Sequence, residues 1–251
     1  MSHHLVSVQD LKFDYPDGTP ALDGVTFTIH HGESVALVGA NGAGKSTILL
    51  HLAGVLFPTS GAVRVGDWPV TRSTLPQIRR SLGMVFQDAD DQLFMPTVEE
   101  DVAFGPMNLG LPEAEVAAQV TAALARVGAT HLRRRPPHRL SGGEKRAAAI
   151  ATVLAMGPSI LVMDEPSSNL DPAARRALIG QLRGFEHTKI VASHDLELVL
   201  DVCQRTIVLG AGRVAADGPT CRVLSDDALL AEARLERPLR LRRCSRCGAA
   251  P

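Results

Sequence analysis

The feature that constrains this sequence most is a glycine-rich loop that joins a predicted buried strand to a predicted helix. Residues 39–47 read Gly-Ala-Asn-Gly-Ala-Gly-Lys-Ser-Thr, between an apolar run at 34–38 and a leucine-rich stretch at 45–53. Glycines let the backbone turn tightly and bring its N–H groups close to phosphate oxygens. The phosphates would then lie at a helix N-terminus, where the helix dipole favours anions. The loop therefore predicts an α/β fold that binds a phosphorylated ligand.

The side chains of this loop supply the cation and the metal ligand that a triphosphate requires. Lys45 offers its charge to the β- and γ-phosphates, and the Ser46 hydroxyl is a ligand for Mg²⁺. A chance glycine turn is the alternative, and the flanking strand and helix disfavour it. The candidate binding residues of the loop are Gly39, Asn41, Gly42, Ala43, Gly44, Lys45, Ser46 and Thr47.

Length and composition limit what the rest of the chain can be. The 251 residues suffice for one large α/β domain or two small ones, and 45% of them are apolar. The net charge of −1 gives no global indication of a nucleic-acid partner, and we expect none. No apolar run approaches the roughly 18 residues that span a bilayer, and the start of the chain lacks the order of a signal peptide. We therefore expect a cytoplasmic protein.

Polar groups suited to phosphoryl transfer follow three other apolar runs. The run at 160–163 leads into Asp164, which would hold Mg²⁺, and Glu165, which would polarise the attacking water. Gln87 could reach Mg²⁺ or the water, and His194 could donate to the γ-phosphate. Taken alone, Gln87 is more often a polar strand end and His194 more often structural. Because the C-terminal ends of parallel strands meet at one edge of a sheet, the set as a whole favours a catalytic site.

A second anion-ready turn lies at residues 140–144, Leu-Ser-Gly-Gly-Glu, at the start of a predicted helix that ends at residue 156. Ser141, Gly142 and Gly143 would stand at the N-terminus of that helix. One copy of the chain does not need two binding sites for a triphosphate. We therefore expect this turn to serve a nucleotide held by another copy.

Tyr15 is the one tyrosine of the chain, in a predicted turn ahead of the glycine loop. Alone, it would be interpreted as a half-buried tyrosine at a hairpin between strands at 5–8 and 25–29. Its place before the loop favours stacking on a purine base.

Two further segments stand out from the strands. Residues 90–155 look mainly helical and form an insertion, with the clearest helix at 112–127. Near its start, residues 88–96 combine three carboxylates with an exposed-looking apolar pair, Leu93 and Phe94. The arginine-rich tail at 226–251 is predicted to be disordered or peripheral, and its Cys244 and Cys247 form half of a zinc site without a visible partner pair.

From residue 5 to 224 the chain resembles the ATP-binding subunit of an ABC transporter. The motifs that carry the resemblance are GANGAGKST at 39, Gln87, LSGGE at 140, ILVMDE at 160, SSNLD at 167 and SHD at 193. The resemblance implies a P-loop NTPase with a RecA-like core, a mainly parallel sheet, an antiparallel β subdomain and an inserted α-helical subdomain. It implies an ATPase domain at 1–225, with helical residues at about 90–155, followed by the tail.

The same resemblance implies a head-to-tail dimer that closes over two ATP molecules, each with Mg²⁺. Lys45, Ser46, Gln87, Asp164, Glu165 and His194 then act on the nucleotide of their own copy. Ser141 and Gly143 contact the γ-phosphate of the partner's nucleotide, Tyr15 stacks on the base, and Asp171 of the SSNLD motif belongs to the site. Glu144 and Asn169 depart from the family's commoner glutamine and small residue. Both half-sites look complete in one sequence, which favours a homodimer.

A narrower resemblance, over residues 86–106 and the motifs LSGGEKR and SHDLELVLDVC, is to the cobalt- and nickel-type ATPases of energy-coupling-factor importers. It implies a peripheral protein at the cytoplasmic face of the cell membrane that energises metal-ion uptake. The membrane subunits would dock near Asp88–Phe94, with Leu93 and Phe94 as anchors. Vitamin uptake, for example of biotin, is the close alternative, and a soluble ABC protein of translation or DNA repair is a more distant one.

Overall fold

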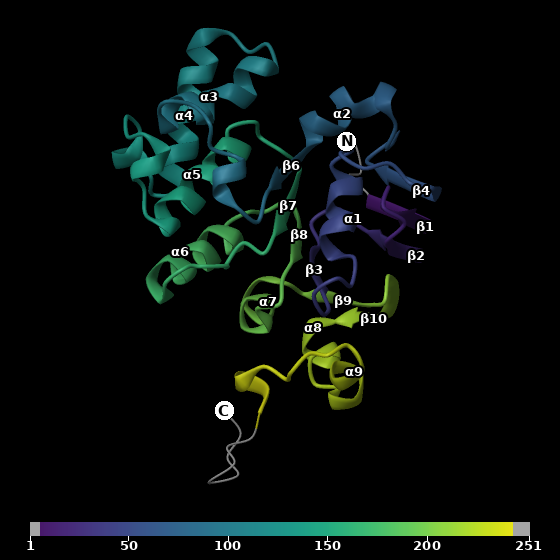
Figure 1. Cartoon of the computed structure of the whole chain (residues 1–251). Helices are drawn as coiled ribbons and strands as arrows, with labels where there is room; N and C mark the ends of the chain where they lie inside the picture. Colours follow the sequence, from purple (N-terminus) through teal and green to yellow (C-terminus); the bar gives the residue numbers. More distant parts are fainter. Residues whose placement is uncertain (1–5, 243–251) are drawn as a thin grey trace.

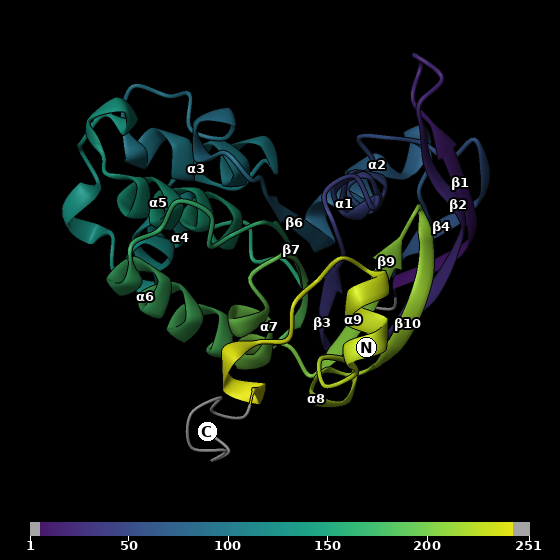
Figure 2. The ribbon, with the colours of Figure 1, turned by 60° about the horizontal axis from the view of Figure 1, so that its bottom comes forward.

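Two β-sheets with a helix between them form the framework of the protein. The computed structural model describes residues 6–242. The larger sheet has six strands in the order β10-β9-β3-β8-β7-β6, all parallel except β10. The smaller, antiparallel sheet has the order β2-β1-β4-β5. Helix α1 lies between the two sheets (Figures 1 and 2). The predicted fold class is therefore confirmed.

The strands are bounded as follows: β1 Val6–Asp14, β2 Pro20–Ile29, β3 Ser34–Val38, β4 Ser60–Val65, β5 Trp68–Pro69, β6 Leu82–Val85, β7 Ile160–Asp164, β8 Thr188–Ala192, β9 Arg205–Gly210 and β10 Arg213–Pro219. Strands β1 and β2 are longer than the runs predicted at 5–8 and 25–29. They pair with each other along their length, and this ladder carries polar residues that interrupt the apolar pattern.

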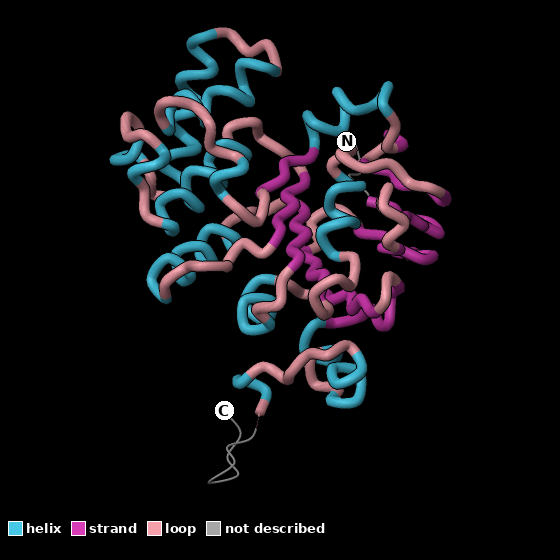
Figure 3. Tube along the Cα trace, viewed as in Figure 1, coloured by secondary structure: helices cyan, strands magenta, loops and turns pink. Residues whose placement is uncertain are grey.

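The helices are α1 Lys45–Leu52, α2 Leu75–Ser81, α3 Val98–Asn108, α4 Glu113–Arg126, α5 Gly142–Leu154, α6 Pro172–Arg183, α7 Leu196–Val202, α8 Thr220–Val223 and α9 Asp227–Glu232. Figure 3 shows them gathered mainly on the side of the large sheet away from the small one. Helices α3 to α5 lie between β6 and β7 in the sequence and contact one another. The predicted domain boundaries themselves stay a prediction.

Strand β3 shows how the sheet separates two hydrophobic cores. All five of its residues are buried, as expected for a central parallel strand. Val35 and Leu37 belong to the core shared with α1 and the antiparallel sheet, whereas Ala36 and Val38 belong to the core shared with the helical side. The alternation follows the two-residue period of a strand. Packing on both faces holds the carboxyl end of β3, and the glycine loop after it, in a fixed place.

The arginine-rich tail is folded as far as the structure describes it. Helix α9 and a 3₁₀ turn at Leu239–Leu241 follow the ATPase core. Arg240 donates to the carboxylate of Glu197 at 2.5 Å and to that of Asp201 at 3.0 Å, both on α7. The prediction of disorder is therefore wrong for this part, because α7 offers carboxylates to the arginines. Cys244 and Cys247 lie outside the described residues.

Candidate functional site

The glycine loop and the strand ends surround one cavity of about 380 Å³. The loop residues come from the turn between β3 and α1, and the others from the ends of neighbouring strands. The predicted site residues that line it are Tyr15, Asn41, Gly42, Gly44, Lys45, Ser46, Thr47, Gln87, Glu165 and His194. Gly39 and Ala43 lie in the loop but do not line this cavity.

Two of the loop glycines are required by their surroundings. Gly44 has a φ of 101°, and a Cβ there would lie 2.6 Å from Cδ2 of Leu22 and 2.9 Å from the carbonyl oxygen of Ala21. A Cβ on Gly39 would collide with the carbonyl oxygen of Leu209. The loop therefore packs against β2 and β9 too closely for a side chain at either position.

Lys45 is buried at the first turn of α1. Its Nζ donates to the carbonyl oxygens of Gly39 at 2.8 Å and Ala40 at 3.2 Å. Burial lowers the pKa of Lys45, and the nearby carboxylates of Glu165 and Asp164 partly offset that effect. The ammonium group therefore lies inside the loop, where it can meet phosphate oxygens.

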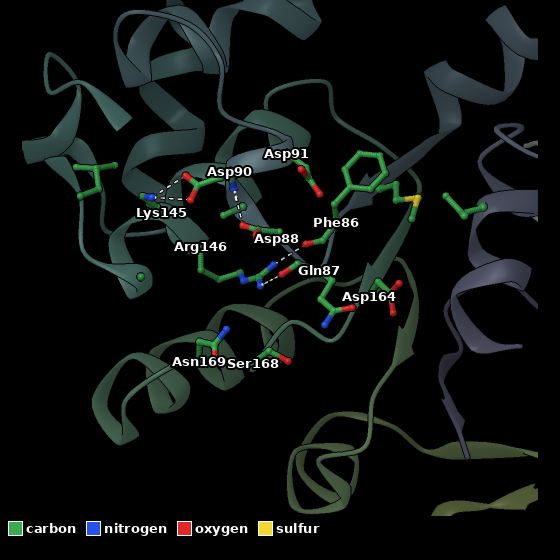
Figure 4. Close-up of a pocket in the computed structure, with 15 residues that line it drawn as sticks. Phe86, Gln87, Asp88, Asp90, Asp91, Lys145, Arg146, Asp164, Ser168 and Asn169 are labelled. Atoms are coloured by element: carbon green, nitrogen blue, oxygen red, sulfur yellow. Dashed lines mark hydrogen bonds and ion pairs between the residues drawn. The ribbon is translucent and has the colours of Figure 1, made fainter. Parts of the chain in front are cut away.

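The residues around Asp164 fit a magnesium ion. Asp164 ends β7 and is buried, and this burial raises the pKa of its carboxyl, while a hydrogen bond with Ser46 lowers it. Its Oδ1 is buried without a hydrogen-bond partner among residues 6–242. A buried carboxylate oxygen without a donor, beside a hydroxyl oxygen, is the donor set that Mg²⁺ prefers. Gln87 lies on the same side of an adjoining cavity as Asp164 (Figure 4).

The carboxylate of Glu165 is fixed by the residues that follow β8. Its Oε2 lies 2.8 Å from Nδ1 of His194 and accepts hydrogen bonds at 3.2 Å from both the His194 N–H and the Ser193 hydroxyl. Glu165 has a φ of 42°, a strained conformation that its N–H stabilises by donating to Ala192 at 2.8 Å. The predicted base and the predicted histidine are thus in direct contact. Ser193 was not predicted as a site residue, although its place directly before His194 in the SHD motif was a usable signal.

Tyr15 stands at the rim of the same cavity. Its hydroxyl lies 2.9 Å from Oγ1 of Thr47, and its ring meets that of Phe13 edge-on with centroids 5.2 Å apart. Both contacts fix the ring beside the loop. Its stacking on a base stays a prediction.

The second anion-ready turn lies apart from the cavity of its own chain. Ser141 caps α5 in a capping box with Glu144: its N–H donates to Oε2 at 2.7 Å, and its hydroxyl lies 2.9 Å from the same oxygen. These hydrogen bonds from Ser141 lower the pKa of Glu144. None of Ser141, Gly142 and Gly143 lines the cavity that holds Lys45. Their contact with a partner's nucleotide stays a prediction.

Asp171 also lies away from that cavity. Its carboxylate caps α6 by accepting from the N–H groups of Ala173 at 2.8 Å and Ala174 at 2.9 Å. Its predicted place in the nucleotide site stays a prediction.

Of the adjacent apolar residues Leu93 and Phe94, the fold buries the first and exposes the second. Leu93 is only 6% exposed and belongs to the hydrophobic core, so the interpretation of it as an exposed anchor is wrong. Phe94 is 62% exposed and meets Phe104 edge-on at 5.0 Å, and Met107 is 65% exposed. Phe104 and Met107 were not predicted from the sequence, although their three-residue spacing places them on one face of a helix. The exposed large apolar side chains of this helical region are therefore Phe94, Phe104 and Met107.

A family model for ABC transporters matches residues 22–168 of the chain. This chain belongs to the ABC transporter ATPase family. The match covers the glycine loop, Asp164 and Glu165, so the family assignment and the geometry concern the same residues. The enzyme hydrolyses ATP, and the hydrolysis is coupled to transport.

Curated relatives extend the similarity over nearly the whole ATPase. A protein of Geobacter sulfurreducens, described as an ABC transporter ATP-binding protein, is 66% identical over 99% of this chain and 100% of its own length. An energy-coupling factor transporter ATP-binding protein of Methanothermobacter thermautotrophicus is 46% identical over 93% of this chain and 77% of its own. A cobalt import ATP-binding protein of Rhodobacter capsulatus is 46% identical over 94% of this chain and 86% of its own length. The resemblance to energy-coupling-factor ATPases is confirmed.

Solved structures share the architecture as well. An ATPase of Clostridium perfringens that forms part of an ABC transporter complex superimposes with a TM-score of 0.79, at 38% identity, over 91% of this chain and 94% of its own. A dimeric ATP-binding cassette with bound ADP and phosphate gives a TM-score of 0.78 at 26% identity, over 86% of this chain and 98% of its own. Within residues 6–242, no helix combines the length and apolar character needed to cross a bilayer.

Proposed function

We propose that this ABC ATPase energises the uptake of a transition metal ion, cobalt or nickel, through membrane partner subunits. The support is the 46% identity to a cobalt import ATPase and the similarity in fold to an ATPase of a transporter complex. The ion is cargo for the membrane subunits, and this chain supplies the ATP-driven motion. Its place would be peripheral, at the cytoplasmic face of the membrane.

The cavity holds the groups that one copy would contribute to hydrolysis. Lys45 and the loop N–H groups would hold the triphosphate, and Ser46 and Asp164, with Gln87 beside them, would hold Mg²⁺, which would supply positive charge to the phosphates. Glu165 orients the attacking water and accepts its proton, while His194 and Ser193 keep that carboxylate in place. The reaction depends on positioning more than on covalent chemistry.

A head-to-tail homodimer supplies the groups that one copy lacks. Ser141 and Gly143 lie outside the cavity of their own chain, at the N-terminus of α5, where N–H groups and the helix dipole favour a phosphate. In the dimer they would meet the γ-phosphate of the partner's ATP, as the dimeric form of a related cassette supports. ATP would thus hold two copies together, and hydrolysis would release them.

The membrane subunits would dock where apolar side chains remain exposed. The surface of Phe94, Phe104 and Met107 adjoins a groove of about 700 Å³ between α2 and α3, which Phe104 lines. An amphipathic helix of a partner would place its apolar face in such a groove. Asp90 is already paired with Lys145, at 2.6 and 2.8 Å, so it is less available to a partner than the sequence suggested.

Transport measurements with the assembled complex test this function. The chain is co-purified with its membrane subunits, reconstituted into vesicles, and assayed for ATP-dependent uptake of radioactive cobalt, nickel and biotin. We expect cobalt or nickel to accumulate, and the Glu165→Gln complex to take up neither while it still binds ATP. Uptake of biotin alone would show that the substrate is a vitamin and not a metal ion. Purification of the chain without any membrane protein would contradict the transport role.

A further inference from the structure

Arg146 connects two parts of the chain that the proposed dimer assigns to different nucleotides. It lies on α5, the helix that begins beside Ser141, and its side chain reaches the loop that follows β6 (Figure 4). Nη1 donates to the carbonyl oxygen of Phe86 at 2.7 Å, and Nη2 donates to that of Gln87 at 2.5 Å. The two bonds tie the backbone of Gln87 directly to α5.

The surroundings of this guanidinium group are not those of a simple packing residue. Arg146 is 4% exposed, both of its acceptors are uncharged carbonyls, and Nε has no acceptor within the described part of the chain. The carboxylates of Asp88 and Asp164 influence it only through space. A buried charge without a direct ion pair is costly to keep, and an apolar side chain would fill the same space with less penalty.

The geometry of the two bonds makes the connection rigid. A planar guanidinium that donates to two successive carbonyls fixes both the distance and the orientation of the loop. Gln87 enters the catalytic cavity beside Lys45 and also lines the adjoining cavity of about 590 Å³, together with Gly142 at the start of α5. A movement of α5 therefore moves Gln87 or breaks both bonds.

We propose that Arg146 is a positioning residue that couples the two nucleotide sites of the dimer. When the N-terminus of α5 closes on the partner's ATP, Arg146 carries that displacement to Gln87 in the site of its own copy. Binding of one ATP would thereby favour binding of the second. This inference rests on the head-to-tail dimer proposed above.

Lys145, the neighbour of Arg146, offers a matched control. Its Nζ bonds both carboxylate oxygens of Asp90, at 2.6 and 2.8 Å, and the Asp90 side chain is 60% exposed. The Lys145 side chain is 22% exposed, and a pair with one partner in solvent contributes little. Lys145→Met removes a charge from the same helix, at the same loop, without touching the bonds to Gln87.

The experiment measures equilibrium binding of a fluorescent ATP analogue with Mg²⁺ to full-length protein that carries Glu165→Gln, which prevents turnover. A coupling of about 5- to 150-fold gives two sites a Hill coefficient of about 1.4 to 1.8. We expect that range for Glu165→Gln and for its combination with Lys145→Met. The combination with Arg146→Met should bind with a Hill coefficient of about 1. Arg146→Lys should also lower the coefficient, because lysine keeps the charge but cannot donate to both carbonyls as the planar guanidinium group does.

Size-exclusion chromatography with ATP separates the failure of this proposal from that of the dimer. If Glu165→Gln stays monomeric with ATP, the dimer and the coupling are both wrong. If it dimerises and Arg146→Met binds as cooperatively as its parent, only the coupling is wrong. An equal loss in Lys145→Met would show a general disturbance of α5 and would also overturn the role of Arg146. Circular dichroism checks folding, and if Arg146→Met fails to fold, a parental Hill coefficient in Arg146→Lys overturns the proposal.

Discussion

The ring nitrogen Nδ1 of His194 lies 2.8 Å from Oε2 of Glu165, so the residue after β8 holds the carboxylate that follows β7. The same oxygen also accepts from the His194 N–H and the Ser193 hydroxyl, each at 3.2 Å. Two donors and a ring nitrogen around one oxygen fix the direction in which the carboxylate points. The histidine therefore contacts the predicted base directly, and its 65% exposed side chain also borders the cavity that Lys45 lines.

Removal of the Ser193 hydroxyl should slow hydrolysis without weakening ATP binding. A buried hydrogen bond of this kind contributes about 1 kcal/mol, so Ser193→Ala should lower kcat about fivefold. The KM for ATP should stay within about twofold, because the glycine loop provides the binding. Steady-state ATPase assays measure both constants, and Ser193→Thr, which keeps a hydroxyl, is the control. A large rise in KM at unchanged kcat would refute the role of Ser193 in holding the base.

Leu93 and Phe94 are adjacent in the sequence but should respond to alanine in opposite ways. Leu93 is buried in the helical core, and Leu93→Ala should lower the free energy of unfolding by about 2–5 kcal/mol. Phe94→Ala removes mainly an exposed ring and its contact with Phe104, so it should cost only about 0.5–1.5 kcal/mol. It should nevertheless abolish co-purification with the membrane subunits. Denaturant titration and affinity purification test the pair, and full retention of the subunits by Phe94→Ala would exclude this docking surface.

The catalytic cavity could be predicted from the sequence because its parts are strand ends and a loop of fixed spacing. Lys45, Glu165 and His194 each follow an apolar run, and a parallel sheet brings the ends of such runs together. Ser193 and Arg146 could not be assigned in the same way. The Ser193 hydroxyl bonds a carboxylate 28 residues earlier in the chain, and Arg146 bonds two backbone carbonyls. Residue types alone do not identify either partner, although the place of Ser193 directly before His194 was a usable signal.

The boundary between core and surface in residues 88–107 was equally beyond the sequence. Leu93 and Phe94 have the same apolar character, and only the packing of α3 against α5 decides which of them is covered. The order of residues 226–242 was missed for a similar reason, since the carboxylates that hold Arg240 lie on α7, about 40 residues earlier in the chain.

A buried histidine makes the stability of the protein depend on pH. His51 lies inside α1, and its Nδ1 is 2.7 Å from the carbonyl oxygen of Thr47. Burial lowers the pKa of His51 below its usual 6.5. The unfolded chain therefore binds a proton more readily, so the stability that His51 contributes is fully present above pH 6.5. It is lost as the pH falls from there through the lowered folded-state pKa.

The slope of this loss is at most about 1.4 kcal/mol per pH unit. Urea unfolding of the wild type and of His51→Leu between pH 5 and 8 measures it. We expect the difference in the free energy of unfolding between the two proteins to change below about pH 6.5, in favour of His51→Leu as the pH falls. A difference that is constant over this range would show that His51 does not titrate differently in the folded state.

Two adjacent glycines distinguish the role of the α5 N-terminus in folding from its role in the dimer. A Cβ on Gly143 would lie 2.8 Å from Cβ of Ala174, so Gly143→Ala should lower the free energy of unfolding by about 1–3 kcal/mol. A Cβ on Gly142 would lie 3.6 Å from the carbonyl oxygen of Asn169, an ordinary contact, so Gly142→Ala should fold as stably as the wild type.

The proposed dimer nevertheless places Gly142 against the partner's triphosphate, where an added methyl group would hold the phosphate away from the helix N-terminus. Gly142→Ala combined with Glu165→Gln should therefore bind ATP but require at least about tenfold more of it to dimerise, a loss of about 1.4 kcal/mol. Analytical ultracentrifugation across a series of ATP concentrations measures this shift. Because the variant keeps its fold, an unchanged dimerisation midpoint can only mean that this turn does not meet the partner's nucleotide.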